Sequence, residues 1–377
     1  MKSFLLQHEE GMSKRKYVLS PYPQLTSISD KHQPTDKGEM LHKKYSDMSD
    51  LQDERLYEGY KHPNSSEWSY KASLKDINRK RNRFSDAFPF DKTRVPLKTI
   101  DPSYSDYINA DYLNLRTGDH AEYIATQGPM RRTFEHFWYM CHQNCQDQII
   151  IVMLTPLTEG TREQCYPYWS HKSNFAIGNR DGLAGGDKLI FYLKNVEKNQ
   201  DYRLSEWEMT AQDANGAAVG KKKQVLHFHF DKWQDFQAAD STDQIIDLSK
   251  RVHELRLPNS IDPVIVHCAA GVGRTGTFIT IDYFLHNCQK LLLEEQTASS
   301  KVTAIPLEST TPPSSTLLSN VEKQATSFDP LFSIVQELRS QRPLMVQRFE
   351  QFVFTYDTVR KFYLDNINEN GRFECTI

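Results

Sequence analysis

The sequence predicts an α+β fold (α/β-like) in which a central twisted mixed β-sheet is flanked by α-helices. Two continuous apolar runs of strand length, at 147–155 and 263–267, are typical of strands buried at the centre of such a sheet. Segments 188–196 and 203–211 have the composition of strands, and 223–230 alternates as a further one. Helical spacing of apolar residues at 133–143, and again from Arg274 onward, supplies the flanking helices.

Composition along the chain predicts one folded domain between two tails. Residues 1–45 are polar, are interrupted by Pro, Ser and Lys, and show no sustained periodicity, so we expect a disordered tail. Residues 46–366 are rich in apolar and aromatic side chains and form the domain, and 367–377 are a second tail. Within the domain, 294–327 is rich in Ser, Thr and Pro, which predicts a flexible insertion.

Charge and cysteine content exclude several classes of protein. The formal net charge is -3 and the basic residues are scattered, so no nucleic-acid surface is expected; the tightest run, at 221–223, is interpreted as a solvated hairpin turn. The apolar stretch near the start is too short for a signal peptide or an anchor, and no later window is long enough to span a membrane. Six dispersed cysteines do not indicate a disulfide framework, which favours a reducing, cytoplasmic location with access to the nucleus.

The stretch "VIVHCAAGVGRTGTF" (264–278) contains a motif that has two interpretations. Gly271, Gly273 and Gly276 match G-x-G-x-x-G, the fingerprint of dinucleotide-binding loops. That interpretation requires a second strand that ends in Asp or Glu roughly 20 residues further on. Glu294 and Glu295 stand at about that distance, but they end a helix and precede the Pro-rich insertion. A dinucleotide site is therefore disfavoured.

The second interpretation is a phosphate-binding loop that carries a nucleophile. A strand, a tight loop and a helix N-terminus follow one another, so successive backbone N–H groups form an anion-binding nest. Cys268 begins this nest, where a thiolate is stabilised, and Arg274 closes it with a planar fork suited to phosphate oxygens. The backbone between them comes from Ala269, Ala270, Gly271, Val272 and Gly273.

Two neighbouring side chains complete the predicted loop. Thr275 offers a hydroxyl near the sulfur, which would stabilise the thiolate as a leaving group. His267 directly precedes Cys268 and can tune the cysteine from behind. A buried cysteine that precedes an arginine by chance is the alternative, and it leaves these other features unexplained.

The segment "HCAAGVGRTG" resembles the H-C-x-x-G-x-x-R-T-G signature of the tyrosine-specific protein phosphatases. The resemblance extends from about 55 to 365 and is greatest to fungal cytosolic, non-receptor members. It includes, in order, the segments "NRKRNRFSDAFPFD", "DYINADYLN", "YIATQGP", "EGTREQCYPYW", "HFHFDKWQDF" and "MVQRFEQFVFTY". It implies a single phosphatase domain that hydrolyses phosphotyrosine on proteins, in signalling.

The resemblance also implies a two-step mechanism. Cys268 would attack the phosphorus and form a cysteinyl-phosphate, while Arg274 and the loop N–H groups hold the oxygens. Asp235 would protonate the tyrosyl oxygen and then accept a proton from water, with Trp233 anchoring its mobile loop. Gln347 would position that water.

Supporting and substrate-binding roles follow from the same resemblance. Gln351 would assist Gln347, and Glu159 would orient Arg274 through an ion pair. Phe84 would form a wall against the phosphotyrosine ring, and Asp86 would accept hydrogen bonds from the substrate backbone. No cofactor and no metal are expected. The partners would be tyrosine-phosphorylated proteins, signalling kinases among them, with no membrane and no nucleic acid involved, and the chain would be a monomer.

Four positions depart from the family pattern without removing a catalytic group. Phe84 replaces a usual tyrosine, Gln234 replaces a proline beside Asp235, and Gln164 replaces a common lysine. Leu344 stands where small residues open a second phosphotyrosine pocket in some relatives.

Rival interpretations remain. Lipid phosphatases place lysines inside this loop, and dual-specificity phosphatases usually lack the phosphotyrosine-recognition loop. A pseudophosphatase that only binds phosphotyrosine would normally have lost Cys268, Arg274 or Asp235. A zinc site formed by His227, His229 and Cys268 is the weakest alternative, because these residues lack the usual ligand spacing.

Overall fold

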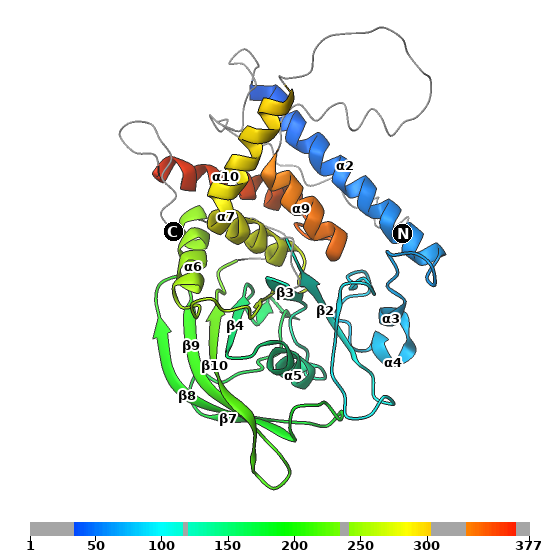
Figure 1. Cartoon of the computed structure of the whole chain (residues 1–377), viewed down its shortest axis with the longest axis vertical. Coiled ribbons are helices and arrows are strands. Elements are labelled where there is room, and N and C mark those ends of the chain that lie inside the picture. Colours follow the sequence, from blue (N-terminus) through cyan, green and yellow to red (C-terminus); the bar gives the residue numbers. More distant parts are fainter. Residues whose placement is uncertain (1–33, 116–119, 234–240, 303–328, 367–377) are drawn as a thin grey trace.

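The computed structural model describes residues 34–115, 120–233, 241–302 and 329–366. Its centre is a nine-stranded sheet in the order β1-β2-β3-β11-β4-β10-β9-β8-β7 (Figure 1). The strands are β1 (Arg94–Pro96), β2 (Tyr107–Leu113), β3 (Tyr123–Thr126), β4 (Gln148–Met153), β7 (Phe175–Gly178), β8 (Lys188–Lys198), β9 (Arg203–Gln212), β10 (Ala218–His229) and β11 (Val264–His267). The pairs β3–β11, β11–β4 and β4–β10 are parallel and the others antiparallel, so the sheet is mixed, as predicted.

Apolar layers cover both faces of this sheet, which explains the continuous apolar run of β4. Ile150 and Val152 belong to a cluster shared with α6 (Thr242–Glu254), α7 (Gly273–Val302), α9 (Pro330–Gln341) and α10 (Phe349–Asp365). Ile149 and Ile151 point to the opposite cluster, which includes α5 (Phe134–Asn144). Successive strand residues face opposite sides, so a strand between two helical layers is apolar at every position.

Helix α2 (Pro34–Lys61) corrects the predicted boundary of the N-terminal tail at residue 45. Leu41 and Met48 are buried and pack with Phe352 of α10 in a small third cluster. Figure 1 shows α2 gathered with α7, α9 and α10 at the top of the molecule. The helix is polar along most of its length, so its packing against the domain stabilises it more than its own sequence does.

The insertion predicted at 294–327 also begins too early, because α7 continues to Val302. Residues 303–327 of the insertion, the first 33 residues of the N-terminal tail and the predicted tail at 367–377 lie outside the described residues. The start of the domain at residue 46 is likewise too late, since α2 begins at Pro34.

The lysine run at 221–223 is not a solvated turn. It lies within β10, and the turn between β9 and β10 is closed earlier, by a hydrogen bond from Asp213 N to Ala217 O. Lys223 is buried and its Nζ donates to His142 O and Cys145 O at 2.5 and 2.6 Å. A local irregularity in strand pairing between Val219 and Lys223 turns this side chain inward.

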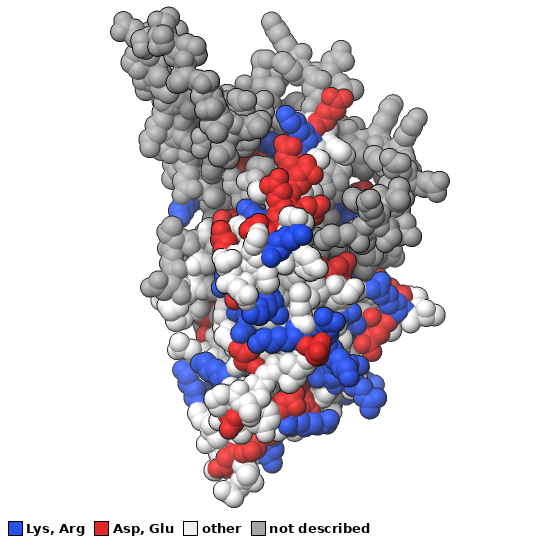
Figure 2. All heavy atoms as spheres, turned by 90° about the vertical axis from the view of Figure 1, so that its right-hand side faces the viewer, with Lys and Arg blue, Asp and Glu red and all other residues white. Residues whose placement is uncertain are grey.

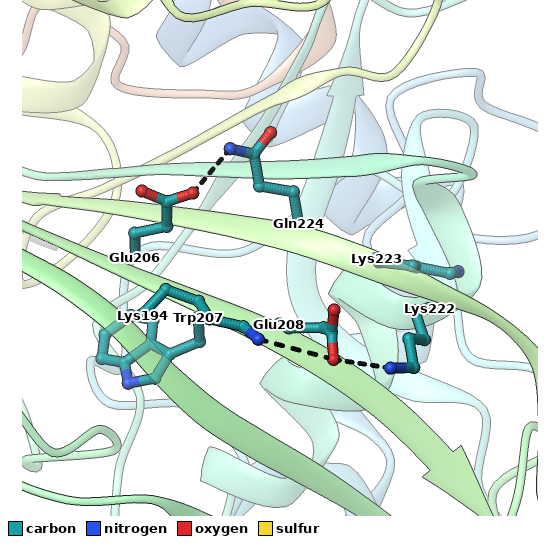
Figure 3. Close-up of a pocket in the computed structure, with 7 residues that line it drawn as sticks. All are labelled: Lys194, Glu206, Trp207, Glu208, Lys222, Lys223 and Gln224. Carbon is teal, nitrogen blue, oxygen red and sulfur yellow. Dashed lines mark hydrogen bonds and ion pairs between the residues drawn. The ribbon is translucent and has the colours of Figure 1, made fainter.

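A pocket lies over β8, β9 and β10 (Figure 3). Its lining residues are Lys194, Glu206, Trp207, Glu208, Lys222, Lys223 and Gln224. Lys222 Nζ lies 2.8 Å from Glu208 Oε1, and Gln224 Nε2 donates to Glu206 Oε1 at 2.9 Å. These contacts pair Lys222 and Gln224 with the two glutamates, whereas the buried Trp207 Nε1 has no hydrogen-bond partner among the described residues.

Charges of both signs share the face seen in Figure 2. Acidic side chains gather in the upper described part of this face, where Figure 1 places α2. Basic side chains gather lower, at the height of α3 (Lys71–Leu74) and α4 (Asp76–Arg79). The described parts of the chain contain no helix that combines the length and hydropathy of a membrane span.

Most of the described cysteines are free. Cys141, Cys145, Cys165 and Cys268 are free thiols, whereas Cys288 is disulfide-bonded.

Candidate active site

The candidate site lies at the carboxyl ends of the parallel strands. The nucleophile loop (residues 268–273) follows β11 and leads into α7. Gly128, which follows β3, donates its N–H to Ala269 O at 2.9 Å. Arg274 contacts Glu159, which follows β4, and the carbonyl of Trp233, which follows β10. Loops that are far apart in the sequence therefore meet at one edge of the sheet, where α/β proteins commonly bind ligands.

Close packing explains the three glycines that resemble a dinucleotide fingerprint. Gly271 has φ +72°, and a Cβ there would lie 2.1 Å from Thr126 O. A Cβ on Gly273 would meet the Gln351 amide at 2.9 Å, and one on Gly276 would meet Val346 N at 2.5 Å. Each glycine thus permits the loop or the start of α7 to lie against a neighbouring segment.

The carbonyls of the nucleophile loop are held from outside the loop. The acceptor and donor pairs are Cys268 O with His267 Nδ1 (3.1 Å), Ala269 O with Gly128 N (2.9 Å), Ala270 O with Arg342 Nη2 (3.1 Å), Gly271 O with Arg342 Nε (2.8 Å) and Val272 O with Val346 N (3.2 Å). A trans peptide directs its N–H opposite to its C=O. The amides that follow these carbonyls therefore point into the loop, where they form an anion-binding nest.

Arg342 is a residue of this site that the sequence analysis missed. Its guanidinium is fully buried and donates to the carbonyls of Ala270 and Gly271. It also pairs with Asp111 Oδ2 at 2.6 Å. A third contact joins Nη2 to Asn109 Oδ1 at 2.8 Å. An arginine only five positions before Gln347 was the available signal, but only the fold shows that it reaches the loop.

The Cys268 sulfur lies inside the nest that its own loop forms. It is buried, and Gly271 N donates to Sγ at 3.2 Å. Burial raises the pKa of the thiols of Cys141, Cys145 and Cys165, so these cysteines stay protonated at neutral pH. Cys268 differs from them in its position, because it directly precedes the loop that leads into the N-terminus of α7.

His267 contacts the backbone of the cysteine and not its sulfur. Its Nδ1 lies 3.1 Å from Cys268 O, and its Nε2 lies 2.7 Å from the Tyr168 hydroxyl. Burial lowers the pKa of His267 to about 3, so the ring is neutral at physiological pH. The ring orients the peptide that begins the loop. Thr275 Oγ1, predicted near the sulfur, is buried and has no hydrogen-bond partner in the structure.

Arg274 is buried, and acceptors on Glu159 and Trp233 orient it. Nη1 donates to Glu159 Oε1 at 3.0 Å, the pairing that the resemblance implied, and to Trp233 O at 2.7 Å. Glu159 lies in a short hairpin of β5 (Thr158–Glu159) and β6 (Arg162–Glu163). Gln164 Nε2 donates to the second oxygen of Glu159 at 3.1 Å, so the residue in the usual lysine position supports the same carboxylate.

The glutamine loop (residues 344–351) lies over the start of α7. Gln347 is half-buried, and its carbonyl accepts a hydrogen bond from the Tyr45 hydroxyl of α2. Gln351 is buried, and its amide faces Gly273 of the nucleophile loop. Leu344 and Val346 have φ values of +67° and +55°, a conformation that is uncommon for residues other than glycine and that clusters at functional sites.

The predicted recognition loop forms one side of the site. Phe84 is half-buried, and the Arg162 guanidinium lies 5.0 Å from its ring centroid. Asp86 is exposed. Arg83 anchors the loop, because its Nε donates to Gly128 O at 3.1 Å and its Nη2 to Pro129 O at 2.8 Å. Phe84 is thus tied to the segment that also holds the nucleophile loop.

Asp235 and Gln234 lie outside the described residues, directly after the buried Trp233. The weak zinc alternative fails, because His227, His229 and Cys268 do not form a group of ligand atoms close enough to share a metal ion in the described part of the chain. Among the described residues, the three-residue group with metal-ligand geometry lies elsewhere.

This geometry agrees with the family to which the sequence profile assigns the chain. The profile described as "Protein-tyrosine phosphatase" matches residues 78–304 and 312–361. The chain belongs to the protein-tyrosine phosphatase family. The predicted family and enzyme class, a non-receptor protein tyrosine phosphatase, are confirmed.

Relatives and solved structures support the same assignment. Tyrosine-protein phosphatase 1 of Saccharomyces cerevisiae is 35% identical, with 87% of this chain and 95% of that protein covered. Tyrosine-protein phosphatase 1 of Schizosaccharomyces pombe is 33% identical over 85% of this chain, which spans 50% of that longer protein. The catalytic domain of human protein tyrosine phosphatase non-receptor type 18 superposes with a TM-score of 0.63 at 26% identity, covering 87% of this chain and 98% of that one. The predicted α+β fold class is thereby confirmed.

Proposed function

We propose that this phosphatase hydrolyses phosphotyrosine through a cysteinyl-phosphate on Cys268. The observation that carries the proposal is the outward hydrogen bonding of the loop carbonyls from Cys268 to Val272, which directs the intervening amides toward a phosphate above the sulfur. Arg274 adds a planar cation at the end of this loop, held by Glu159. Such preorganised donors stabilise the charge of the transferring phosphoryl group.

In the first step the Cys268 thiolate attacks phosphorus, and a sulfur–phosphorus bond forms as the bond to the tyrosyl oxygen breaks. Asp235, in its acid form, donates a proton to that oxygen, so neutral tyrosine leaves. Trp233 supports this assignment, because it packs against Phe354 in the core directly before the loop that carries the acid.

In the second step a water molecule attacks phosphorus and the sulfur–phosphorus bond breaks. The Asp235 carboxylate accepts the proton of that water, and Gln347 and Gln351 position it. Arg274 holds the phosphoryl oxygens in both steps. The Thr275 hydroxyl donates to the departing thiolate, a role consistent with a buried hydroxyl that has no other partner.

The partners of the reaction are tyrosine-phosphorylated proteins. Human non-receptor type 18 phosphatase has been solved with phosphopeptides of HER2, and its fold is shared by this chain. Phe84 would pack against the substrate ring and Asp86 would accept hydrogen bonds from its backbone. We extend the proposal to signalling kinases as substrates, to a monomeric state and to a cytoplasmic location with access to the nucleus.

Turnover of matched peptides tests the proposal. The purified chain should hydrolyse a phosphotyrosine peptide and leave its phosphothreonine counterpart almost untouched. In this proposal the tyrosine side chain is long enough to pack against Phe84 while its phosphate contacts Cys268, and the threonine side chain is too short to do both. Cys268→Ser should abolish hydrolysis while circular dichroism stays unchanged, because a serine hydroxyl remains protonated in this nest. Substantial residual activity of Cys268→Ser would remove the nucleophile assignment, and equal turnover of both peptides would remove the tyrosine selectivity.

A further inference from the structure

A compact group of metal-ligating side chains lies outside the active site, between α6 and α7. It consists of His253 from α6, and Asp282 and His286 from α7, one helical turn apart. The Asp282 carboxylate is fully buried, whereas the side chains of His253 and His286 are 23% and 12% exposed. The group therefore has a buried carboxylate and two histidine side chains that solvent reaches.

The distances within the group fit a small cation. His253 Nε2 lies 3.1 Å from Asp282 Oδ2, and His286 Nε2 lies 4.0 Å from Asp282 Oδ1. All three ligand atoms lie within 4.8 Å of one another. Ligands at the usual zinc distances of roughly 2.1 Å lie about 3.4 Å apart in a tetrahedron. Shifts of the side chains by less than an ångström would meet that geometry.

The two imidazole rings of the group are stacked face to face. Their centroids are 3.3 Å apart and their planes differ by 16°. Because the lone pair of each nitrogen lies in the plane of its ring, one ring must turn out of the stack before both Nε2 atoms can face one cation.

Two hydroxyl groups hold the Asp282 carboxylate in position. Ser249 Oγ donates to Asp282 Oδ1 at 2.6 Å, and the Tyr123 hydroxyl donates to Oδ2 at 2.7 Å. His253 Nε2, at 3.1 Å from Oδ2, is a third contact, so one of the about four acceptor positions of the carboxylate is left for a metal. Hydrogen-bonded carboxylates of this kind are typical outer-shell support in metal sites.

We propose that His253, Asp282 and His286 bind a divalent cation of the zinc class, with water at the fourth position. The cation links α6 to α7, the helix that begins at the nucleophile loop, and stabilises their packing. The site is independent of phosphotyrosine hydrolysis and amends the expectation from sequence that the chain holds no metal.

Zinc titration of the full chain in a Cys268→Ser background tests the proposal, because that background removes the active-site thiolate as a competing ligand. Competition with a chromophoric chelator should show one bound equivalent, and zinc should raise the midpoint of thermal unfolding. His286→Gln should weaken binding at least about 10-fold, the loss that removal of even an outer-shell partner commonly causes. His62→Gln, a change at an exposed histidine, should leave binding unchanged.

Absence of a bound equivalent in the Cys268→Ser chain would overturn the proposal. Equal affinity of the parent and the His253→Asn/His286→Gln double variant would also overturn it. Should that double variant not fold, cobalt binding to the parent decides the question. A four-coordinate site with nitrogen and oxygen ligands gives intense visible absorption bands, and the weak bands of six-coordinate cobalt would contradict the site.

Discussion

Arg342 joins the nucleophile loop to the sheet. Its guanidinium contacts Asp111 and Asn109 of β2 on one side and the carbonyls of Ala270 and Gly271 on the other. Removal of one partner from such a buried pair typically costs about 3–5 kcal/mol of stability. The same side chain thus supports the fold and fixes the direction of the loop amides.

Arg342→Lys should separate these two contributions. Lysine keeps a positive charge beside Asp111, but a single ammonium cannot replace the planar fork that reaches both loop carbonyls. We expect kcat for a phosphotyrosine peptide to fall on the order of 100-fold, the effect of a small misplacement of catalytic groups, with the fold retained. Arg79→Lys at an exposed arginine is the control. A kcat within twofold of wild type would show that the loop does not depend on Arg342.

Asp235→Ala tests the acid directly and separates an enzyme from a binding module. General acid catalysis typically contributes about 10²–10⁴-fold in rate, while ground-state binding needs no proton transfer. Single-turnover rates should therefore fall by that factor, while equilibrium binding of the same phosphotyrosine peptide stays equal or becomes tighter. If the native chain already binds the peptide without turnover, the pseudophosphatase interpretation is correct. Gln234→Pro, beside Asp235, would then be the first variant to test for a gain of turnover.

At the scale of elements, α2 and α9 hold the backbone of the glutamine loop. Tyr45 of α2 donates to Gln347 O, and Gln52 Oε1 accepts from Leu344 N at 2.7 Å. Arg339 of α9 donates to Met345 O at 2.8 Å and to Val346 O at 2.9 Å. These contacts stabilise a loop that contains two residues with positive φ.

Tyr45→Phe should slow the second chemical step more than the first. A lost hydrogen bond is worth about 1 kcal/mol, which corresponds to roughly a fivefold lower rate if the contact persists in the transition state. Rapid mixing with an aryl phosphate should therefore reveal a larger burst of phenol, because the cysteinyl-phosphate accumulates. Tyr57→Phe on the same helix, at a side chain 56% exposed, is the matched control. Equal bursts in the two variants would exclude a positioning role for Tyr45.

At the scale of the whole molecule, buried histidines make the fold sensitive to mild acid. Burial lowers the pKa of His142 and His171 to about 4 and that of His267 to about 3. Burial also lowers the pKa values of His136, His227 and His229. The unfolded chain binds protons near pH 6.5, at which these folded residues stay neutral.

The free energy of unfolding should therefore be greatest above pH 6.5 and decrease as the pH falls toward 4. A fully buried histidine such as His267 contributes up to about 1.4 kcal/mol per pH unit, and half-buried ones such as His171 contribute less. Urea unfolding at pH 7 and pH 5 should give a lower midpoint at pH 5. An unchanged midpoint would mean that these residues are protonated in the folded state.

Features that are contiguous in the chain could be predicted from the amino-acid sequence. The segment 264–278 carries its strand, its nucleophile, its glycines and its arginine together, so local order was enough to predict a phosphate loop. The apolar runs of β4 and β11 likewise predicted central strands, because burial on both faces leaves no polar position.

The distant residues that support that loop became visible only in the folded structure. Arg342 lies 71 positions from Gly271, and Tyr45 lies 302 positions from Gln347, so neither spacing nor periodicity could connect them. Helix α2 is polar on average and has little preference of its own for a buried position, and it becomes ordered by packing against α9 and α10. Contacts of this kind depend on how layers meet in space, a property of the assembled core that no single segment encodes.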